Sequence, residues 1–585
     1  MRKEKSLRAA GFGATALLLA SMVAVPAPAK AAEPVRLGQG WSAAEWVKFY
    51  GTDQGSRIMP LDWILALKQP NGQPFLADNL SRYGYLPNPD SDPPGLPVGF
   101  NVASQNGVQT IGMTCAACHT RQINAGGTAY RIDGGPAFTD LQGFFADLDT
   151  AVGTAVNDAA AFSAFAKSVI GLDATPDQEK ALHQQVADWY LLDHTLMTKS
   201  LAGASWGPVR ADAVSMIFNR LTGLDIGAAP NHLLAENIFP ATAPVRYPFI
   251  WNAPKQDKTQ WPGFAANGDN LLGLARNLGE VFGVFGAFHP YKTKWKFLGI
   301  DYVGQNSGDW EGLDTLENLA ASLQPPKWPS SVKYDPRLAA KGKEIFAWTT
   351  AQGGCVECHG IAKGMPRLGN VDTWKTPVID VGTDSKEWSL IADPARLVNP
   401  GVLTGACIPG AVWPPLGAKE SGLKVLTVSV LGSILQHYSL LKILPAIPCR
   451  DQADMAKALA TLQKQIDELK DAFTPQAQGA GAIVYESRVM EGIWAAAPYL
   501  HNGSVPTLAD LLKPAAQRPT SFKVGPDYDL DKVGLAATQS KFNFTYTATG
   551  CGAGRNSGNS NCGHEYGTSL SPENKQALLE YLKTL

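Results

Sequence analysis

Apolar positions at helical spacing define a segment that begins at Asp335. Aspartate is a typical N-cap, and Pro336 suits the first helical position because its missing N–H would have no partner there. The apolar or small residues of one face follow: Leu338, Gly342, Ile345 and Phe346. The pattern predicts an amphipathic helix in which Gly342 leaves room for a close neighbour.

A second helix is predicted at the end of the chain. It begins at Ser571-Pro572 and carries Tyr581 beside an apolar stripe that consists of Leu578, Leu582 and Leu585. We predict that the two helices cross at Gly342 and that Phe346 packs against Tyr581 there. Two unrelated amphipathic helices are the alternative.

The first 31 residues have the pattern of an export signal. A basic start with Arg2 and Lys3 precedes an apolar stretch from Ala14 to Val25, and Ala29-Lys30-Ala31 offers a small-residue cleavage site. The stretch is short for a membrane span, although an uncleaved anchor is the alternative. No later segment has the apolar length to cross a bilayer, so we expect a periplasmic or secreted protein without a membrane span.

Length and charge narrow the class of protein. A chain of 585 residues predicts two or more domains with sizeable cores. The formal net charge is only -2, and the sequence has neither the basic footprint of a nucleic-acid-binding protein nor a polybasic membrane patch.

Eight cysteines divide into two tight pairs and four separate residues. The pairs are Cys115 with Cys118 and Cys355 with Cys358. The separate residues are Cys407, Cys449, Cys551 and Cys562. In an exported protein these four are expected to form disulfides, and three pairings are possible. Cys407–Cys449 with Cys551–Cys562 closes the shortest loops and is the expected one.

Each tight pair belongs to a C-x-x-C-H motif, which ends at His119 in the first case and at His359 in the second. Two thiols at this spacing can form thioethers to one edge of a porphyrin, and the next histidine then reaches the iron. A zinc site would need the two pairs close together, and a thioredoxin-like motif has no use for the histidine. We therefore expect two covalently bound haem c groups with His119 and His359 as iron ligands.

These observations predict a mainly α fold with two cytochrome c-like haem domains and long loops. The N-terminal haem domain would span residues 32–325, after a signal peptide over 1–31. The C-terminal domain would span residues 326–585. The long stretch between the first haem motif and Trp261 is interpreted as a mostly helical insertion.

The chain resembles the bacterial diheme cytochrome c peroxidase family, which includes the diheme enzyme that matures tryptophan tryptophylquinone. The resemblance rests on the two haem motifs, on the run from Trp251 to Glu280, and on Tyr-Leu-His-Asn-Gly-Ser at 499–504. It implies that His501 interacts with a haem propionate, that Trp261 lies between the haems and that Glu280 faces the reactive iron. It also implies a calcium ion between the domains, for which no acidic loop is evident.

Physical chemistry gives Trp261 and Glu280 plausible catalytic roles. A tryptophan between two porphyrins can relay electrons, and a carboxylate above an open iron can move a proton between peroxide oxygens. The alternatives are a core aromatic residue for Trp261 and a solvated helix residue for Glu280.

Two departures from the family matter. The chain is long and pairs C-A-A-C-H with Ile-Asp-Gly-Gly-Pro at 132–136, which resembles the long-chain branch that includes the rubber oxygenases. Those enzymes cleave polyisoprene with dioxygen at the N-terminal haem. In addition, the family's methionine ligand is missing, because Ala515 occupies its place.

A low-spin second haem needs another axial ligand. His564 is favoured because a Cys551–Cys562 bridge would close its glycine-rich loop, and because bis-histidine ligation is implied by the resemblance to rubber oxygenases. His501 and a surface position for His564 are the alternatives. The first haem has no evident second ligand among His183, His194, His232 and His289, so an open iron is expected there.

Three functions follow. In the leading one, a small donor protein or dye-like donor reduces the C-terminal haem, and electrons pass through Trp261 to the N-terminal haem, where Glu280 assists peroxide reduction. In the second, a dioxygenase cleaves an apolar organic substrate such as polyisoprene. The aromatic segment over residues 281–295 motivates it, through Phe282, Phe285, Phe288 and Tyr291. The third is an electron carrier without substrate chemistry.

Overall fold

A computed structural model describes residues 33–105, 107–201, 203–296, 299–367, 371–393, 396–407, 414–437 and 483–585. The predicted signal peptide and Cys449 lie outside these residues. Within the described part of the chain, every helix is too short or too polar to cross a bilayer.

The N-terminal part builds two three-stranded sheets around the first haem motif. One sheet has the order β2-β4-β3 and the other β1-β6-β5. Antiparallel pairing joins β3 to β4 and β5 to β6. The bounds are β1 Val35–Arg36, β2 Met59–Pro60, β3 Phe100–Gln105, β4 Val108–Met113, β5 Thr120–Ala125 and β6 Thr128–Asp133, with helices α1 Ala43–Gly51 and α2 Leu61–Ala66. The motif at 115–119 lies between β4 and β5, so both sheets position it.

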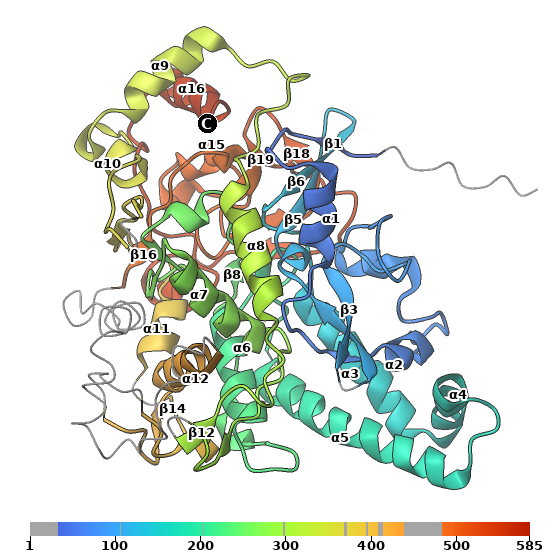
Figure 1. Cartoon of the computed structure of the whole chain (residues 1–585). Helices are drawn as coiled ribbons and strands as arrows, with labels where there is room; N and C mark the ends of the chain where they lie inside the picture. The colour runs from blue at the N-terminus through green and yellow to red at the C-terminus, as the bar shows by residue number, and fades with distance from the viewer. Residues whose placement is uncertain are drawn as a thin grey trace, which may run out of the picture.

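The described part of the stretch between this motif and Trp261 contains four α-helices, as the sequence predicted in part, but it also contains strands such as β5 and β6, so it is not mostly helical throughout. Its helices are α3 Leu141–Asn157, α4 Ala159–Ile170, α5 Pro176–Ser200 and α6 Ala213–Arg220. Aspartate or threonine caps begin all four, at Asp140, Asp158, Thr175 and Asp212. Helices α4 and α5 lie at the lower right of Figure 1, where they pack against α2 and α3.

Helices from both halves of the chain form a further core beside the insertion. They are α7 Asn270–Gly283, α8 Trp310–Ser322 and α12 Gly422–His437. Helix α7 contacts α6, α8 and α12, and it carries Glu280 in its last turn. The core is filled by aliphatic and aromatic side chains such as Leu278, Phe282 and Val430.

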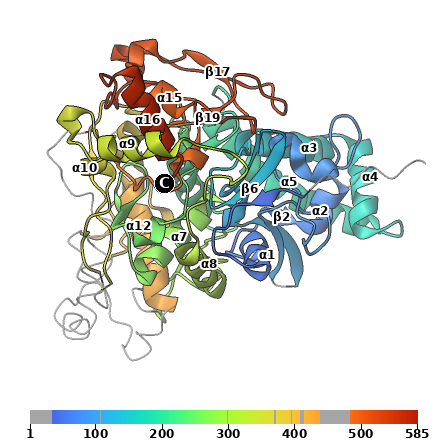
Figure 2. The same ribbon diagram turned by 90° about the horizontal axis from the view of Figure 1, so that it is seen from above.

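The predicted helix crossing in the C-terminal part is confirmed. Helix α9 (Pro336–Phe346) and helix α16 (Pro572–Leu582) lie side by side (Figure 2). A Cβ atom at Gly342 would collide with the carbonyl oxygen of Ala577. The rings of Phe346 and Tyr581 meet edge to face, with centroids 5.4 Å apart. Glycine is therefore required at the crossing.

The remaining described elements are short. The helices are α10 Val356–His359, α11 Lys386–Ala392 and α15 Leu508–Leu511. The strands pair two by two: β7 Arg210–Ala211 with β8 Val245–Arg246, β9 Lys258–Thr259 with β10 Ala265–Ala266, β11 Tyr291–Lys292 with β12 Ile300–Asp301, β13 Val378–Ile379 with β16 Tyr485–Glu486, β14 Leu397–Val398 with β15 Glu420–Ser421, β17 Ser521–Lys523 with β20 Thr545–Thr547, and β18 Tyr528–Asp529 with β19 Gly534–Leu535.

The described residues form both helices and many short strands, so the fold is mixed, whereas the sequence predicted a mainly α fold. One core also joins the two halves, since it contains Trp251 and Trp494 together. The division at residue 325 and the two cytochrome c-like domains stay predictions. The expected Cys551–Cys562 disulfide is confirmed, and Cys407 is also disulfide-bonded, although its expected partner Cys449 lies outside the described residues.

Candidate haem sites

The first motif presents one histidine nitrogen and two thiols from a tight turn. Cys115–Ala117 form a 3-10 turn, which Thr114 caps by accepting from the N–H of Ala116. The Nδ1–H of His119 donates to the carbonyl oxygen of Pro248 at 2.9 Å. Burial lowers the pKa of His119 to about 4, so the ring is neutral and its Nε2 lone pair is available to a metal.

The second motif repeats this arrangement. The Nδ1–H of His359 donates to the carbonyl oxygen of Arg488 at 2.7 Å. In each motif the accepting carbonyl follows its histidine by 129 residues. Burial lowers the pKa of His359 as well. The two histidines are therefore held in the same tautomer by equivalent backbone groups.

The four motif cysteines are free thiols. Burial raises the pKa of Cys115 and Cys118 to about 12, and that of Cys355 to about 11. Burial raises the pKa of Cys358 as well. Thiols with the pKa of Cys115, Cys118 and Cys355 stay protonated at neutral pH, unlike the thiolate that a thioredoxin-like redox motif uses. The absence of a bond within either described pair suits thiols that form thioethers.

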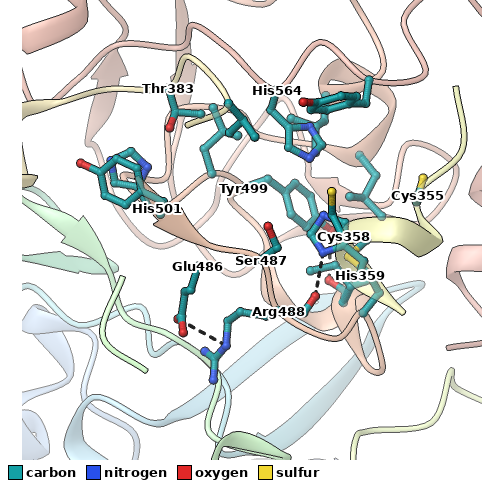
Figure 3. Close-up of a pocket in the computed structure, with 18 of the residues that line it drawn as sticks. Cys355, Cys358, His359, Thr383, Glu486, Ser487, Arg488, Tyr499, His501 and His564 are labelled. Atoms are coloured by element: carbon teal, nitrogen blue, oxygen red, sulfur yellow. Dashed lines mark hydrogen bonds and ion pairs between the residues drawn. The ribbon is translucent and has the colours of Figure 1, made fainter. Parts of the chain in front are cut away.

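His564 faces His359 across a pocket (Figure 3), and their ring centroids lie 6.0 Å apart at an interplanar angle of 49°. An imidazole nitrogen lies about 1.1 Å from its ring centre and bonds a metal at about 2 Å, so two rings on one ion have centres about 6.2 Å apart. The observed separation therefore fits one iron between the two rings.

Backbone contacts hold His564 in this position. Its N–H donates to the carbonyl oxygen of Val381 at 2.8 Å, and its own carbonyl accepts from Arg518 Nη2 at 3.1 Å. The backbone has a φ of 49°, in the left-handed region, and the Cys551–Cys562 disulfide ends two residues earlier. The Nδ1 atom is buried without a hydrogen-bond partner. Burial, and then the nearby His359 ring, lower the pKa of His564 to about 3.

His501 lines the same pocket from a different side (Figure 3). Its ring stacks on Tyr485 at 3.8 Å and lies 6.5 Å from the Trp261 ring. The geometry thus favours His564 over His501 as the residue opposite His359. An interaction of His501 with a haem propionate stays a prediction.

The pocket between these histidines suits a large apolar ring with an anionic edge. It contains about 1260 Å³ of space between protein atoms, part of it open to solvent. Aliphatic side chains form much of its wall, including Val381, Val489, Leu508, Leu512 and Leu578. Two buried cations, Arg246 and Arg488, also line it, and Arg488 Nη1 has no hydrogen-bond partner. Arg488 also pairs with Glu486 and donates to Gln256, so only its Nη1 group remains to bind a further anion. Apolar walls, two cysteines, two histidines and this Nη1 group fit haem c.

Trp261 lies in the wall of this pocket. Residues 246–248 connect it to the first motif. The Nε1–H of Trp261 donates to the carbonyl oxygen of Arg246 at 2.8 Å. The next residue, Tyr247, has its ring 6.5 Å from the ring of His119, and Pro248 accepts the His119 hydrogen bond. A short path of hydrogen and backbone bonds therefore joins Trp261 to the first histidine, although Trp261 is also buried in a small core with Val245 and Tyr485.

Glu280 lies near the first motif. Its Oε1 accepts from Gln260 Nε2 at 2.7 Å, and Arg276 Nε lies 3.9 Å from the same oxygen. The carboxyl group is close enough to Cys115 to raise the pKa of that thiol. Although 42% of the side chain is accessible, its depth in the protein raises the pKa of Glu280 itself. The carboxyl group is thus hydrogen-bonded by Gln260 while part of the side chain remains open to solvent.

Other predicted site features are dispersed. The imidazole of His183 bonds the carbonyl of Val156, that of His194 pairs with Asp149, and His232 stacks on His289 at 4.1 Å. Within the described ranges, none of these four histidines contacts His119.

The aromatic residues of 281–295 do not form one pocket wall. Phe282 packs on Phe288 in one core, whereas Phe285 stacks on Phe145 in another. Tyr291 is exposed. The aromatic segment that motivated the dioxygenase alternative is thus divided between separate cores, since spacing along the chain does not decide which core each ring joins.

The structure gives no separate metal cluster in the residues it describes: no three His, Cys, Asp or Glu side chains converge there. The calcium ion stays a prediction, because backbone carbonyls and water also serve as calcium ligands. The carbonyls of Pro248 and Arg488, together with Gln260, are site groups that the motifs did not reveal.

Comparison with known proteins bears on the class of this site. A family model described as RoxA-like, cytochrome c-like matches residues 484–523, the segment that contains Arg488 and His501. A cytochrome c-like region implies covalently bound haem c, so the class is that of haem-dependent redox proteins.

The relatives are themselves uncharacterized. Uncharacterized protein y4iJ of Sinorhizobium fredii (strain NBRC 101917 / NGR234) is 30% identical over 617 residues, which cover 94% of this chain and 93% of that protein. The chain belongs to the family of this protein. Uncharacterized protein y4iM of the same organism is 26% identical over 288 residues, 49% of this chain and 48% of its own length.

Proposed function

We propose that the protein is an exported diheme c-type oxidoreductase of the peroxidase type. Haem c, when bound at the two C-x-x-C-H motifs, would supply electron transfer and peroxide reduction. Electrons would enter at the His359 and His564 site and reach the His119 site by way of Trp261. The observation that carries the proposal is the Glu280 carboxyl group, which is held by Gln260 beside the first motif and has a raised pKa.

Glu280 would act as the proton carrier at the first site. Its raised pKa keeps the group closer to the pH at which it can both accept and return a proton. Gln260 holds Oε1 in place, which leaves Oε2 to accept a proton from one peroxide oxygen and deliver it to the other. Arg276 forms an ion pair with Glu317 as well, so its positive charge is shared between Glu317 and Glu280.

The exposed surface around the second motif supports a small redox protein as electron donor. Trp348, Val356, Ile361 and Met365 are exposed apolar side chains in or near this motif. Short electron-transfer encounters use small interfaces with an apolar centre, so such a surface fits a transient partner. A dye-like donor would need access only to this exposed surface beside the second motif.

A dioxygenase that cleaves an apolar substrate such as polyisoprene is the second candidate. The match to a RoxA-like model at residues 484–523 favours it. The acidic group near Cys115 and the dispersal of the aromatic segment count against it, because oxygenation of an alkene requires an apolar pocket.

One pair of assays separates the candidates. Purified protein is mixed with peroxide and a reduced donor, either a small cytochrome or a dye, and donor oxidation is followed. The same protein is incubated with polyisoprene and oxygen, and carbonyl products are measured. Donor oxidation that depends on Glu280 supports the proposal. Carbonyl products without donor oxidation support the dioxygenase, and neither activity would indicate an electron carrier.

A further inference from the structure

A lysine-rich hairpin projects from the core that contains α7 and α12. Its strands β11 and β12 pair Tyr291 with Asp301 and Lys292 with Ile300. The N–H of Thr293 donates to the carbonyl of Gly299 at 3.0 Å. Ile300 and the adjoining Tyr302 are buried in the core, so the hairpin stands on a rigid base. Strand β12 lies at the lower edge of the molecule in Figure 1.

The tip of this hairpin exposes a large aromatic ring. Trp295 is 80% exposed, and the ammonium group of Lys294 lies 4.8 Å from the ring centroid. Tyr291 is 44% exposed at the start of the same hairpin. Among the described residues Lys294 lies beside this indole, yet most of the ring remains exposed, which is typical of a binding surface.

The charge at the tip is positive. Lys292, Lys294 and Lys296 are all exposed. Lys296 Nζ lies 3.4 Å from Asp301, whose carboxylate is buried and also accepts from the hydroxyl of Tyr291. As far as the described residues extend, Lys292 and Lys294 have no carboxylate within ion-pair distance. Two ammonium groups are therefore left to attract an anionic partner.

We propose that residues 291–296 dock the protein on an anionic lipid surface. The lysines would pair with lipid phosphates, and the rings of Trp295 and Tyr291 would enter the headgroup region, where amphipathic aromatic side chains are most stable. This is peripheral attachment and is independent of the haem chemistry. Three lysines are too few to form a polybasic patch in the sequence; the exposed indole beside them is what the structure adds.

The shape of the hairpin favours lipid over an acidic protein. A stable protein interface buries about 800 Å² on each partner. The described residues 291–296 expose the rings of Trp295 and Tyr291, which is much less area than a rigid partner surface needs. A bilayer accommodates a single inserted ring, because its headgroup region deforms around it.

The test is sedimentation of the full holoprotein with sucrose-loaded vesicles. Vesicles of phosphatidylcholine alone are compared with vesicles that contain three parts in ten of phosphatidylglycerol. We expect binding to the anionic vesicles only, and weaker binding at high salt. The double variant K292Q/K294Q should bind about 25-fold more weakly, at about fivefold per lysine. The variant W295S should lose about tenfold or more.

Two matched controls accompany these variants. K341Q/K343Q removes the same charge from exposed positions of α9, and L172S removes a side chain that is 84% exposed at the turn after α4. Both should bind as the natural protein does. Equal binding to both vesicles, or equal losses in the control and hairpin variants, would overturn the proposal. So would binding of the anionic vesicles that is indifferent to the hairpin.

A second measurement detects insertion of the hairpin directly and does not rely on variants that bind vesicles more weakly. A W295C variant carrying an environment-sensitive dye should shift to shorter emission wavelength with anionic vesicles and remain unshifted with neutral ones. A shift produced instead by an acidic carrier protein would overturn the lipid assignment.

Discussion

Replacement of His564 by glycine tests the ligand geometry of the second site most directly. If His359 and His564 hold one iron between rings 6.0 Å apart, removal of the His564 ring opens a coordination position there. Glycine is preferred to alanine because residue 564 has a φ of 49°, and a left-handed residue with a Cβ costs about 1–2 kcal/mol. The backbone bonds to Val381 and Arg518 involve main-chain atoms of residue 564, so the loop keeps these anchors.

The expected number of CO molecules bound equals the number of irons that lack a second protein ligand. The natural protein should bind one CO per two reduced haems, because only the His119 site is expected to lack a second protein ligand. H564G should bind two. The matched variant H501G should still bind one, since His501 stacks on Tyr485 instead of facing His359. Titration of the reduced Soret band with CO gives both numbers, and added imidazole should restore the second site of H564G.

The number of CO molecules bound can also refute the assignment of His564 as the ligand. If H564G still binds one CO and H501G binds two, His501 is the ligand and the observed 6.0 Å approach is incidental. If the natural protein binds none, both irons are closed and the peroxidase proposal fails. A thermal midpoint of H564G close to that of the natural protein would show that the loop has remained folded.

The remaining predictions concern four other residues. E280Q keeps the hydrogen bond to Gln260 but cannot carry a proton, so peroxide turnover should fall by about 10²–10⁴-fold in a steady-state assay while the spectrum is unchanged. W261F keeps an aromatic ring but loses the bond to Arg246, so electron transfer between the haems, followed by stopped flow, should slow while CO binding is unchanged. G342A forces a Cβ against the Ala577 carbonyl and should cost about 1–3 kcal/mol in urea unfolding, whereas K341A on the exposed face should cost little. Burial lowers the pKa of His501 to about 3, below its ordinary value, so its stabilising contribution is present above pH 6.5 and falls by about 1.4 kcal/mol per pH unit towards pH 3; H501Q should make acid unfolding shallower.

The sequence predicted those site residues that chemistry requires to be adjacent. A thioether pair and its histidine must lie on one turn, so Cys355, Cys358 and His359 form a contiguous motif that is visible without a structure. The same holds for the helix crossing, because a glycine between two apolar stripes leaves few other arrangements. His564 was favoured for a local reason too, its disulfide-closed loop.

Groups that act through the backbone could not be predicted. The carbonyls of Pro248 and Arg488 orient the two histidines from 129 residues away, and every residue type has a carbonyl. The sequence also does not show in which core an aromatic ring packs. Phe282 and Phe285 lie three positions apart but pack in different cores, because the chain turns at the end of α7, where Phe285 has a φ of 69°.

The two motif histidines have the same setting, so the different roles that we propose for the two sites must arise elsewhere. Each imidazole donates Nδ1–H to a backbone carbonyl, and burial lowers the pKa of both. Two ligands prepared so similarly would give their metals similar electron density. Under the proposed function the difference would come from the residue opposite each histidine, which at the second site would be the imidazole of His564. Near the first motif the corresponding group is Glu280, a carboxyl group whose pKa is raised by burial and which offers no ring nitrogen. A closed site that transfers electrons beside an open site that handles protons is the division of labour that peroxide reduction requires.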